Sequence, residues 1–367
     1  MSEIIPSVNQ KTRIIEDAIT LFVNGKVYEG WKDVQIEREM NVIASPFTLS
    51  ATEKWSSSGE PWRIKPGDHT HIHMGDASVH TGYVDSMDLD FDPSSRVTKI
   101  SGRSRTGDLV DCSVVGQNEY RNLFINEIAT KLCEPFGIRV LLRSTAGEKI
   151  AQFTVKQGET VYEALDRLAR MRSLILYPSY QSNLIMERKG NIVAKGELIQ
   201  GQNILRGSAA YDNSERFSKY IIKGQNPGSI AGLPEQNVGA KGEATDAGIH
   251  RYRPLIVVAE NSVDNNSSAE RAKYEANIRL AKALTVSLEV QGWYQKDGTP
   301  WEVNQLIYVN VPYLGIRSKL LCKKVKFTKG SDGTKTSLEL IHPKAFEFDS
   351  SEVAKPKDDL LARLGAE

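Results

Sequence analysis

The 367-residue sequence has few of the features that mark secreted or membrane proteins. Its three cysteines, Cys112, Cys133 and Cys322, are too widely spaced for a zinc motif or a disulfide framework. We interpret them as reduced, buried thiols of a chain that is made and folded in a cytoplasm. Hydrophobic runs such as 255–259 fall far short of the roughly 20 residues of a membrane-spanning helix. The N-terminus lacks the apolar segment of a secretory signal, and we expect no membrane insertion.

The sequence also lacks an excess of charge of either sign. Lys and Arg number 47 against 46 Asp and Glu, which leaves a formal net charge of +1. A protein held on nucleic acid by bulk charge is normally more basic. The hydrophobic fraction of 40% excludes disorder of the whole chain, and the length is sufficient for two to three domains.

Hydrophobic periodicity divides the chain into β and α+β parts. In residues 18–116, short alternating runs such as 19–23 are separated by turn residues, which is typical of a small barrel or sandwich. In residues 118–190, apolar positions recur at helical spacing. Thr160, followed three residues later by Glu163, predicts a capping box at the start of a helix there.

We predict a mainly β fold with α+β insertions, in which two similar small β-barrel domains flank an α+β domain. The predicted segments are an N-terminal arm at 1–17, a first β-barrel domain at 18–116, an α+β domain at 118–190, a connecting region at 191–283 with a long loop at 224–248 and a helix at 268–284, a second β-barrel domain from 210–224 plus 284–348, and a charged C-terminal tail at 349–367.

A Pro-Trp pair occurs once in each predicted β domain. Pro61-Trp62 and Pro300-Trp301 each begin a strand region that continues into an alternating stretch. The repeat indicates a duplicated domain, with chance recurrence of one dipeptide as the open alternative. We expect both tryptophans to be largely buried, because a large ring beside a strand start covers a barrel end or a contact between barrels.

Three histidines, His69, His71 and His73, alternate along one predicted strand, with His80 nearby. Residues at this spacing share a strand face, and three imidazoles are a ligand set for a tetrahedral metal. Neighbours on one face are about 6.6–7 Å apart, however, which separates the end imidazoles. We therefore interpret the row as the polar outer face of a strand and predict no metal site. The inward residues of that strand are then Thr70, Ile72 and Met74.

Acidic residues follow on the next predicted strand. A calcium cluster or a pair of glycosidase carboxylates is one interpretation. A solvated edge that prevents pairing between sheets is the other, and we favour it. The residues are Asp85, Asp88, Asp90 and Asp92.

Basic residues gather at Arg103, Arg105 and in the run 322–329, which reads Cys-Lys-Lys-Val-Lys-Phe-Thr-Lys. Cationic strands can line a nucleic-acid groove, but aromatic stacking partners are sparse here. We interpret these side chains as the exposed face of strands.

Residues 155–161 resemble the opening of a peptidoglycan-binding LysM repeat, although a convincing second helix of that repeat is absent. No nucleophile elbow, phosphate loop or dinucleotide fingerprint occurs in the sequence. We predict no catalytic, cofactor-binding or metal-binding residues and no enzymatic activity.

Several stretches resemble the baseplate hub family of Mu-type contractile-tailed phages, the tail protein P family. The most specific is Ser-Gly-Arg-Ser-Arg-Thr-Gly-Asp-Leu-Val-Asp at 101–111. The sequence is more distantly similar to the late control protein D family and to the hub portion of type VI secretion spikes. The resemblance covers about residues 18–348. The stretches are 21–31 with 36–38, 64–68 with 81–85, 101–113, and 158–165.

The resemblance implies a structural protein of the virion tail baseplate. It implies a homotrimer in which two similar barrels per chain make a six-barrel ring that joins a six-fold tail tube to a three-fold spike and forms a channel. The implied partners are the tail spike protein and the tail tube and baseplate proteins, and DNA would pass through the channel without specific binding. A cell-wall-binding or peptidoglycan-hydrolysing tail component is the alternative.

Overall fold

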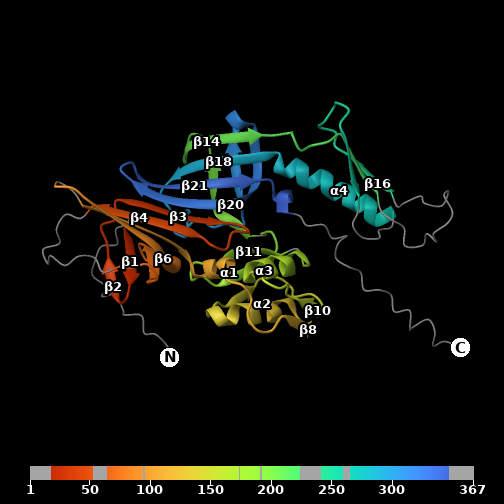
Figure 1. Cartoon of the computed structure of the whole chain (residues 1–367). Coiled ribbons are helices and arrows are strands. Elements are labelled where there is room, and N and C mark those ends of the chain that lie inside the picture. Colours follow the sequence, from red (N-terminus) through yellow and green to blue (C-terminus); the bar gives the residue numbers. More distant parts are fainter. Residues whose placement is uncertain are drawn as a thin grey trace.

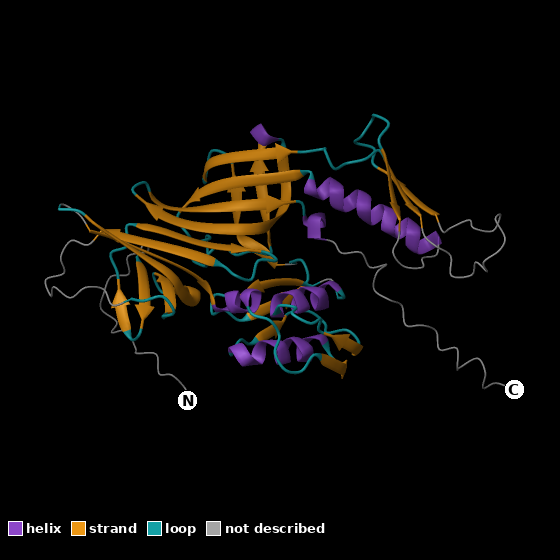
Figure 2. Ribbon diagram, in the orientation of Figure 1, coloured by secondary structure: helices purple, strands orange, loops and turns teal. Residues whose placement is uncertain are grey.

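The computed structural model describes residues 18–52, 64–93, 96–172, 174–190, 192–223, 241–258 and 265–346. Strands dominate these residues, and most of them join one 13-stranded sheet (Figures 1 and 2). Most helical residues lie apart from this sheet, in a unit below it and in one at its right-hand end, and one short helix lies at its upper edge (Figure 2). The prediction of a mainly β fold is confirmed.

The first β half of the large sheet comes from residues 19–104. Its strands follow the lateral order β2-β1-β5-β6-β7-β4-β3, and every neighbouring pair is antiparallel. The strands are β1 (Ile19–Val23), β2 (Lys26–Tyr28), β3 (Asp33–Glu39), β4 (Pro46–Thr52), β5 (His69–Met74), β6 (Ala77–Phe91) and β7 (Arg96–Ser104).

The second β half comes from two separate stretches of the chain. Its lateral order is β13-β19-β20-β21-β18-β14, and only the β13–β19 pair is parallel. The strands are β13 (Ile192–Ile199), β14 (Ile204–Tyr211), β18 (Leu284–Gln291), β19 (Gln305–Val311), β20 (Ile316–Gly330) and β21 (Gly333–Ile341).

The two β halves have the same strand order. Along the chain, β1, β3, β4, β5, β6 and β7 correspond in turn to β13, β14, β18, β19, β20 and β21, and the lateral neighbours match. The direction of the first strand differs, because β1 is antiparallel to β5 whereas β13 is parallel to β19. The long central strands β6 and β20 also match in detail. Each has 15 residues, and each carries a register shift where it faces the next strand, at Val84/Ser86 and at Cys322/Lys324. This agreement supports the duplication that the Pro-Trp repeat indicates.

Closure into barrels is not part of the described strand pairing. No described hydrogen-bonded ladder joins β13 to β14, or β1 to β3, so the described sheet is open at β2, β13 and β14. The residues that form the second β half also differ from those expected. Residues 219–223 lie outside the large sheet, and β13 and β14 take their place. Both of these strands are largely exposed, so they lack the strong hydrophobic alternation that marks a half-buried strand.

The α+β unit, residues 105–187, lies below the large sheet in Figure 1 and has its own hydrophobic core. Helix α3 starts with the predicted capping box: the Thr160 hydroxyl accepts from the Glu163 amide at 3.2 Å, and the Glu163 carboxylate accepts from the Thr160 amide at 2.8 Å. The elements are η1 (Arg105–Gly107), α1 (Asp108–Asp111), β8 (Glu119–Leu123), α2 (Ile125–Cys133), η2 (Glu134–Phe136), β9 (Val140–Leu142), β10 (Ile150–Thr154), α3 (Val161–Arg170), β11 (Ile175–Pro178) and β12 (Leu184–Glu187).

An outer unit is inserted between β14 and β18 and lies to the right in Figure 1. It consists of the strands β15 (Lys219–Lys223), β16 (Lys241–Thr245) and β17 (Pro254–Val258) with the helix α4 (Asn265–Lys282). The strand β16 occupies part of the expected loop 224–248, of which residues 224–240 lie outside the described part. Two short helices, η3 (Pro312–Leu314) and η4 (Pro343–Phe346), complete the second half.

Of the two tryptophans expected to be buried, Trp301 is 3% exposed and lies in the core of the large sheet. A Cβ atom on Gly196 of β13 would come within 2.7 Å of its ring, so the strand backbone packs directly on the indole. Trp62 lies outside the described residues, as do the expected arm at 1–17 and the tail at 349–367.

Replacement of Trp301 by Ala should lower the free energy of unfolding by roughly 3–5 kcal/mol, because it leaves a large cavity against β13. Tyr252, which is 93% exposed, provides the control, and its replacement by Ala should change stability by less than about 0.5 kcal/mol. Urea unfolding followed by far-UV circular dichroism measures both. Equal effects for the two variants would contradict the packing described here.

Candidate functional site: the junction around Arg38

Strands β3 and β20 join the two β halves into one sheet. Residues 34–39 of β3 pair antiparallel with residues 329–324 of β20. On one face of this junction, Val34 and Ile36 lie with Val325 and Phe327, and all four are buried. The junction is therefore a continuous part of the core and fixes one half against the other.

The opposite face of the junction carries a ladder of ion pairs. Lys324 Nζ lies 2.7 Å from Glu37 Oε2, and Lys326 Nζ lies 3.3 Å from the same carboxylate. Lys323 Nζ contacts Glu39 at 3.2 Å. Burial raises the pKa of Glu37, but the hydrogen bonds and charges of Lys324 and Lys326 outweigh it, so that this pKa lies below its usual value. The basic run 322–329 thus neutralises acidic residues of the same chain, and three of its lysines are engaged within the junction.

Arg38 connects three parts of the structure from a position that is 3% exposed. Its Nη1 donates to Glu302 Oε1 of the second half at 2.8 Å. Its Nη2 donates to the carbonyl of Pro178 in the α+β unit. The guanidinium lies 4.0 Å from the centroid of the Tyr180 ring. Burial disfavours the charge, but Glu302 more than compensates, and the pKa of Arg38 is raised.

The turn after β3 adds further contacts with the α+β unit. Asn41 donates its backbone N–H to the Leu176 carbonyl at 2.9 Å and accepts from the Leu176 amide at 3.2 Å. The Tyr162 hydroxyl donates to the Asn41 carbonyl at 3.0 Å. The Tyr180 hydroxyl donates to the Trp301 carbonyl at 3.1 Å, so the same unit also contacts the second half. These bonds hold the α+β unit against both halves at one place.

The stretch 101–111, the most specific part of the family resemblance, connects the first half to the α+β unit. Arg103 donates to Asp85 at 2.7 Å and to Asp111 at 2.8 Å. Arg105 donates to the carbonyls of Phe136 and Gly137 at 3.1 and 3.2 Å. Both arginines are therefore used in contacts within the chain.

The histidine row lies on β5 as expected, with Thr70, Ile72 and Met74 buried on the inner face. The rings of His69 and His71 are 4.5 Å apart, and His71 Nδ1 lies 3.3 Å from the Thr81 hydroxyl. Within the described ranges, no group of three or more His, Cys, Asp or Glu side chains is arranged to hold a metal ion.

His80 is the histidine whose environment is unusual. It is 3% exposed and packs edge-on against Phe47, with ring centroids 4.9 Å apart. Burial, and then the charge of Arg38, lowers the pKa of His80 to about 3. His80 is therefore neutral in the folded protein at neutral pH. It lies in the core, against Phe47 and near the charge of Arg38.

The four aspartates of β6 and its turn do not form one site. Asp85 pairs with Arg103, whereas Asp88 and Asp90 are exposed further along the strand.

Of the three cysteines, Cys133 and Cys322 are buried as expected, and burial raises the pKa of Cys133 to about 12. Cys112 is exposed, which corrects the expectation of a buried thiol. It lies just after α1, where the apolar pattern of the helix has ended.

Residues 155–161 form the loop that opens α3. Glu159 accepts from the Lys156 amide at 2.8 Å and from Arg167 at 2.8 Å. Hydrogen bonds from Arg167 dominate over partial burial, and the pKa of Glu159 lies below its usual value. The LysM-like sequence thus forms the loop before α3, which Glu159 stabilises through these hydrogen bonds.

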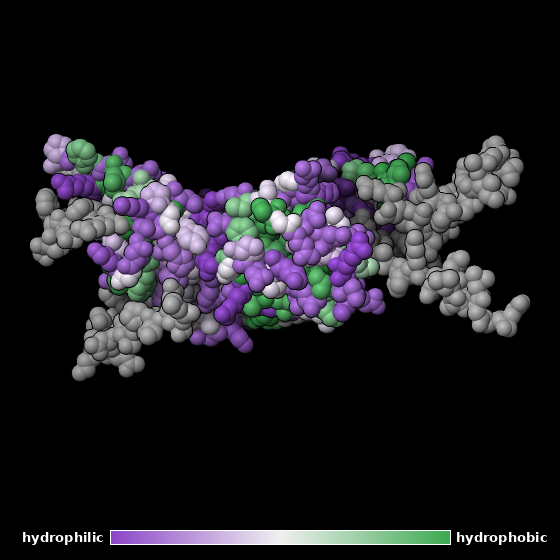
Figure 3. Space-filling view, turned by 60° about the horizontal axis from the view of Figure 1, so that its bottom comes forward, coloured by the Kyte–Doolittle hydropathy of each residue, from purple (hydrophilic) through white to green (hydrophobic). Residues whose placement is uncertain are grey.

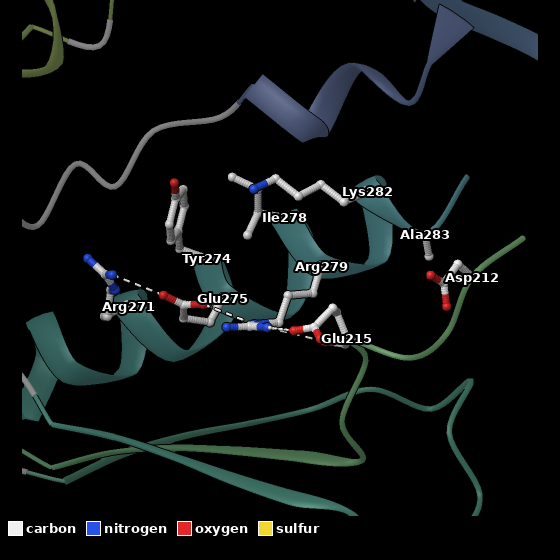
Figure 4. Close-up of a pocket in the computed structure, with 9 residues that line it drawn as sticks. All are labelled: Asp212, Glu215, Arg271, Tyr274, Glu275, Ile278, Arg279, Lys282 and Ala283. Atoms are coloured by element: carbon white, nitrogen blue, oxygen red, sulfur yellow. Dashed lines mark hydrogen bonds and ion pairs between the residues drawn. The ribbon is translucent and has the colours of Figure 1, made fainter. Parts of the chain in front are cut away.

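A cavity of about 340 Å³ lies along α4, between the helix and the chain that follows β14. Figure 4 shows a chain of ion pairs along it, in which Arg271 and Arg279 flank Glu275, and Glu215 contacts Arg279. Tyr274, Ile278 and Lys282 also line the cavity and lie along the upper edge of the helix in Figure 4. The charges that line the cavity are balanced by one another, and no nucleophile with an adjacent base occurs among the lining residues.

Comparison with known proteins identifies the class. Three family models match separate parts of the chain: Mu phage baseplate assembly protein GpP-like, N-terminal, at residues 18–104; baseplate hub protein gp44-like, second domain, at 106–188; and Mu phage baseplate assembly protein GpP, fourth domain, at 264–349. These matches define a phage baseplate protein. None of the described helices is long and apolar enough to span a membrane.

The relatives identify the family within that class. The baseplate hub protein gp44 of Escherichia phage Mu is 31% identical over 344 residues, which cover 90% of this chain and 89% of the relative. The 43 kDa tail protein of prophage MuSo2 from Shewanella oneidensis is 30% identical, with a TM-score of 0.79 over 91% of this chain and 99% of that one. The chain belongs to the Mu phage baseplate hub family.

A more distant likeness concerns the fold alone. A component of the type VI secretion system of E. coli has a TM-score of 0.54 at 10% identity, over 87% of this chain and 76% of that one. The relatives are structural baseplate proteins, which confirms the expectation that the chain is not an enzyme and argues against the hydrolase alternative.

Replacement of Arg38 by Met should lower the free energy of unfolding by about 3–5 kcal/mol, because it leaves Glu302 and the Pro178 carbonyl without their buried partner. Arg103→Met is the matched control. It removes two exposed ion pairs, which should contribute only about 0–1 kcal/mol each. Urea unfolding of both variants gives the comparison. A smaller loss for Arg38→Met than for Arg103→Met would disprove the importance of the buried junction.

Stability should also fall as the pH drops below about 6.5, because the unfolded chain then protonates His80 while the folded chain does not. The loss should reach about 2 kcal/mol at pH 5 and increase toward pH 3. His80→Leu should flatten this dependence between pH 6.5 and 5, above the range in which carboxylates titrate. The pKa of half-buried His73 is also lowered, chiefly by burial, so His73→Gln is the comparison and should flatten the dependence less than His80→Leu does. Parallel stability curves for the wild type and His80→Leu would contradict the prediction.

Proposed function

We propose that the chain forms the trimeric hub of a contractile tail baseplate. Each copy contributes two β units of matching strand order, and three copies make a ring of six such units around a channel. Each β half closes into a barrel in this assembly, the second one from β13, β14 and β18–β21. The ring joins a six-fold tail tube on one side to a three-fold spike on the other.

The equivalence of the two β halves is the observation that carries this proposal. A trimer of an unduplicated chain offers three equivalent surfaces, whereas a trimer of a duplicated chain offers both a three-fold and a near six-fold arrangement. Such a protein is suited to a place in the tail where a six-fold part meets a three-fold part. Membership of the baseplate hub family supports the same role.

The proposed partners are the spike protein and the tube and baseplate proteins. The likeness of fold to a type VI secretion component supports a spike partner, because that protein is described as structurally similar to the phage T4 tail proteins gp27 and gp5. DNA passes through the channel without sequence-specific contacts, in keeping with the near-zero net charge. The α+β unit lies outside the ring, where its helices do not obstruct the channel.

The purified chain should have a mass of about 122 kDa in solution, three times 40.8 kDa. Each copy should bury more than about 1,000 Å² against its neighbours, as obligate oligomers do. Multi-angle light scattering at micromolar concentration measures the mass. A monomer with normal thermal stability would disprove the ring.

A further inference from the structure

Besides the outer edges of β2 and β13, two further strand edges of the large sheet have no pairing partner in the described part of the chain. The first is the outer edge of β14, whose other edge pairs with β18. The second is one edge of the outer part of β6, residues 86–91. On that side, β5 pairs with β6 only as far as Tyr83, while β7 occupies the other side along residues 82–91.

The duplication makes these two edges equivalent to the two that meet at the junction. In the second half, β20 corresponds to β6: its first part pairs with β19, and its outer part, residues 324–329, pairs on the same side with β3. The strand β14 corresponds to β3. The structure therefore shows how the outer part of the long strand in one half receives the end strand of the other half. The equivalent contact with the halves exchanged would pair β14 with the outer part of β6, and it is not made within one copy.

We propose that β14 of one copy pairs antiparallel with residues 86–91 of β6 in the next copy. This seam repeats the β3–β20 junction between copies. It deepens the proposed ring by naming the surfaces through which the copies meet. Since each copy offers one β14 edge and one β6 edge, the contact is head-to-tail, and it closes into a ring when the rotation per copy permits.

The register of the seam follows from the register of the junction. The matching shifts in β6 and β20 make Val84 equivalent to Cys322, and therefore Leu89 equivalent to Phe327. The pairing of β4 with β7 and of β18 with β21 makes Ala209 equivalent to Ile36. Phe327 faces Ile36 in the junction, so Leu89 faces Ala209 in the seam. The complete set is Met87 with Tyr211, Asp88 with Ala210, Leu89 with Ala209, Asp90 with Ser208 and Phe91 with Gly207.

The chemistry of the two edges fits this register. Leu89, Phe91 and Tyr211 are 65%, 86% and 62% exposed in the single chain, and the seam covers all three. Phe91, the most exposed of them, faces Gly207, beside which the side chains of Leu288 and Leu314 lie. Neither Asp88 nor Asp90 faces another acid. Figure 3 shows hydrophobic surface at the left-hand tip of the molecule, where the β6–β7 ribbon ends in Figure 1.

The edge of β14 also lacks the devices that normally protect a free strand. Such edges usually carry lysine, proline or inward-pointing charges. The eight residues Ile204–Tyr211 include one charged side chain, Arg206, and no proline. An edge of this length and composition is suited to pairing with another strand.

Disulfide cross-linking tests the register directly. Leu89→Cys and Ala209→Cys are combined in a chain whose exposed Cys112 is replaced by Ser. Directly opposed residues of antiparallel strands lie within disulfide reach, so mild oxidation should convert most of the protein into a covalent trimer on a non-reducing gel. In the control, Arg206→Cys replaces Ala209→Cys. The shift of three residues moves the thiol about 10 Å along the strand, and the control should stay monomeric on the gel.

Each result of this experiment decides something. Equal cross-linking of both pairs, or cross-linking of the control alone, would overturn the register. A native trimer whose in-register pair stays unlinked would overturn the seam and leave the ring intact. A ladder that continues beyond three copies would support the seam and overturn the trimeric ring. A monomeric native mass would overturn both.

A charge in the seam gives a second test that needs no cysteine. Phe91→Glu should raise the concentration at which the assembly half-dissociates at least tenfold. Tyr252→Glu, at an equally exposed aromatic residue outside the seam, should leave that concentration unchanged. Sedimentation on dilution measures both, and far-UV circular dichroism confirms that each variant is folded. If Phe91→Glu half-dissociates at the same concentration as the wild type, the seam is overturned.

Discussion

The pairing of β3 with β20 is the interaction on which the rest of the structure depends. It unites the two β halves through strands that lie almost 300 residues apart in the chain, and it buries an apolar face while charges pair on the other. Arg38 then ties the α+β unit to the same strand. A buried arginine is costly to desolvate unless its donors are satisfied. Because Glu302, Pro178 and Tyr180 come from different parts of the chain, this charge is satisfied only when all three units are assembled.

Because the two β halves are alike, the contact that joins them within the chain can also form between copies. Within the chain, the outer part of a long bent strand receives the end strand of the other half. The register shifts in β6 and β20 lie where each strand leaves its first neighbour, and shifts of this kind bend a strand and increase its twist. The bend directs the outer part of the strand away from its own half and leaves it free to pair elsewhere.

The sequence was sufficient to predict features that depend on residues a few positions apart. The capping box at Thr160 and Glu163 lies within four residues, and the inward face of β5 follows from alternation alone. The junction could not be predicted in this way, because Lys324 and Glu37 are neutralised across strands that only the tertiary fold brings together. The strands β13 and β14 were missed because half-burial creates the alternating pattern and both are mostly exposed. Cys112 shows that a small apolar side chain does not by itself indicate burial.

The two joints of the proposed ring differ in ways that suit their roles. The junction within the chain has an ion-pair ladder on its outer face and Arg38 at its end, so it is specific and forms together with the fold. In the seam, Tyr211 takes the place of Arg38, and Ala210 takes the place of Glu37. No ladder of opposite charges is then available, and association rests on backbone pairing and the burial of apolar side chains. Such a contact needs no charged partner to be desolvated, which allows copies that fold separately to meet through edges already in their final form.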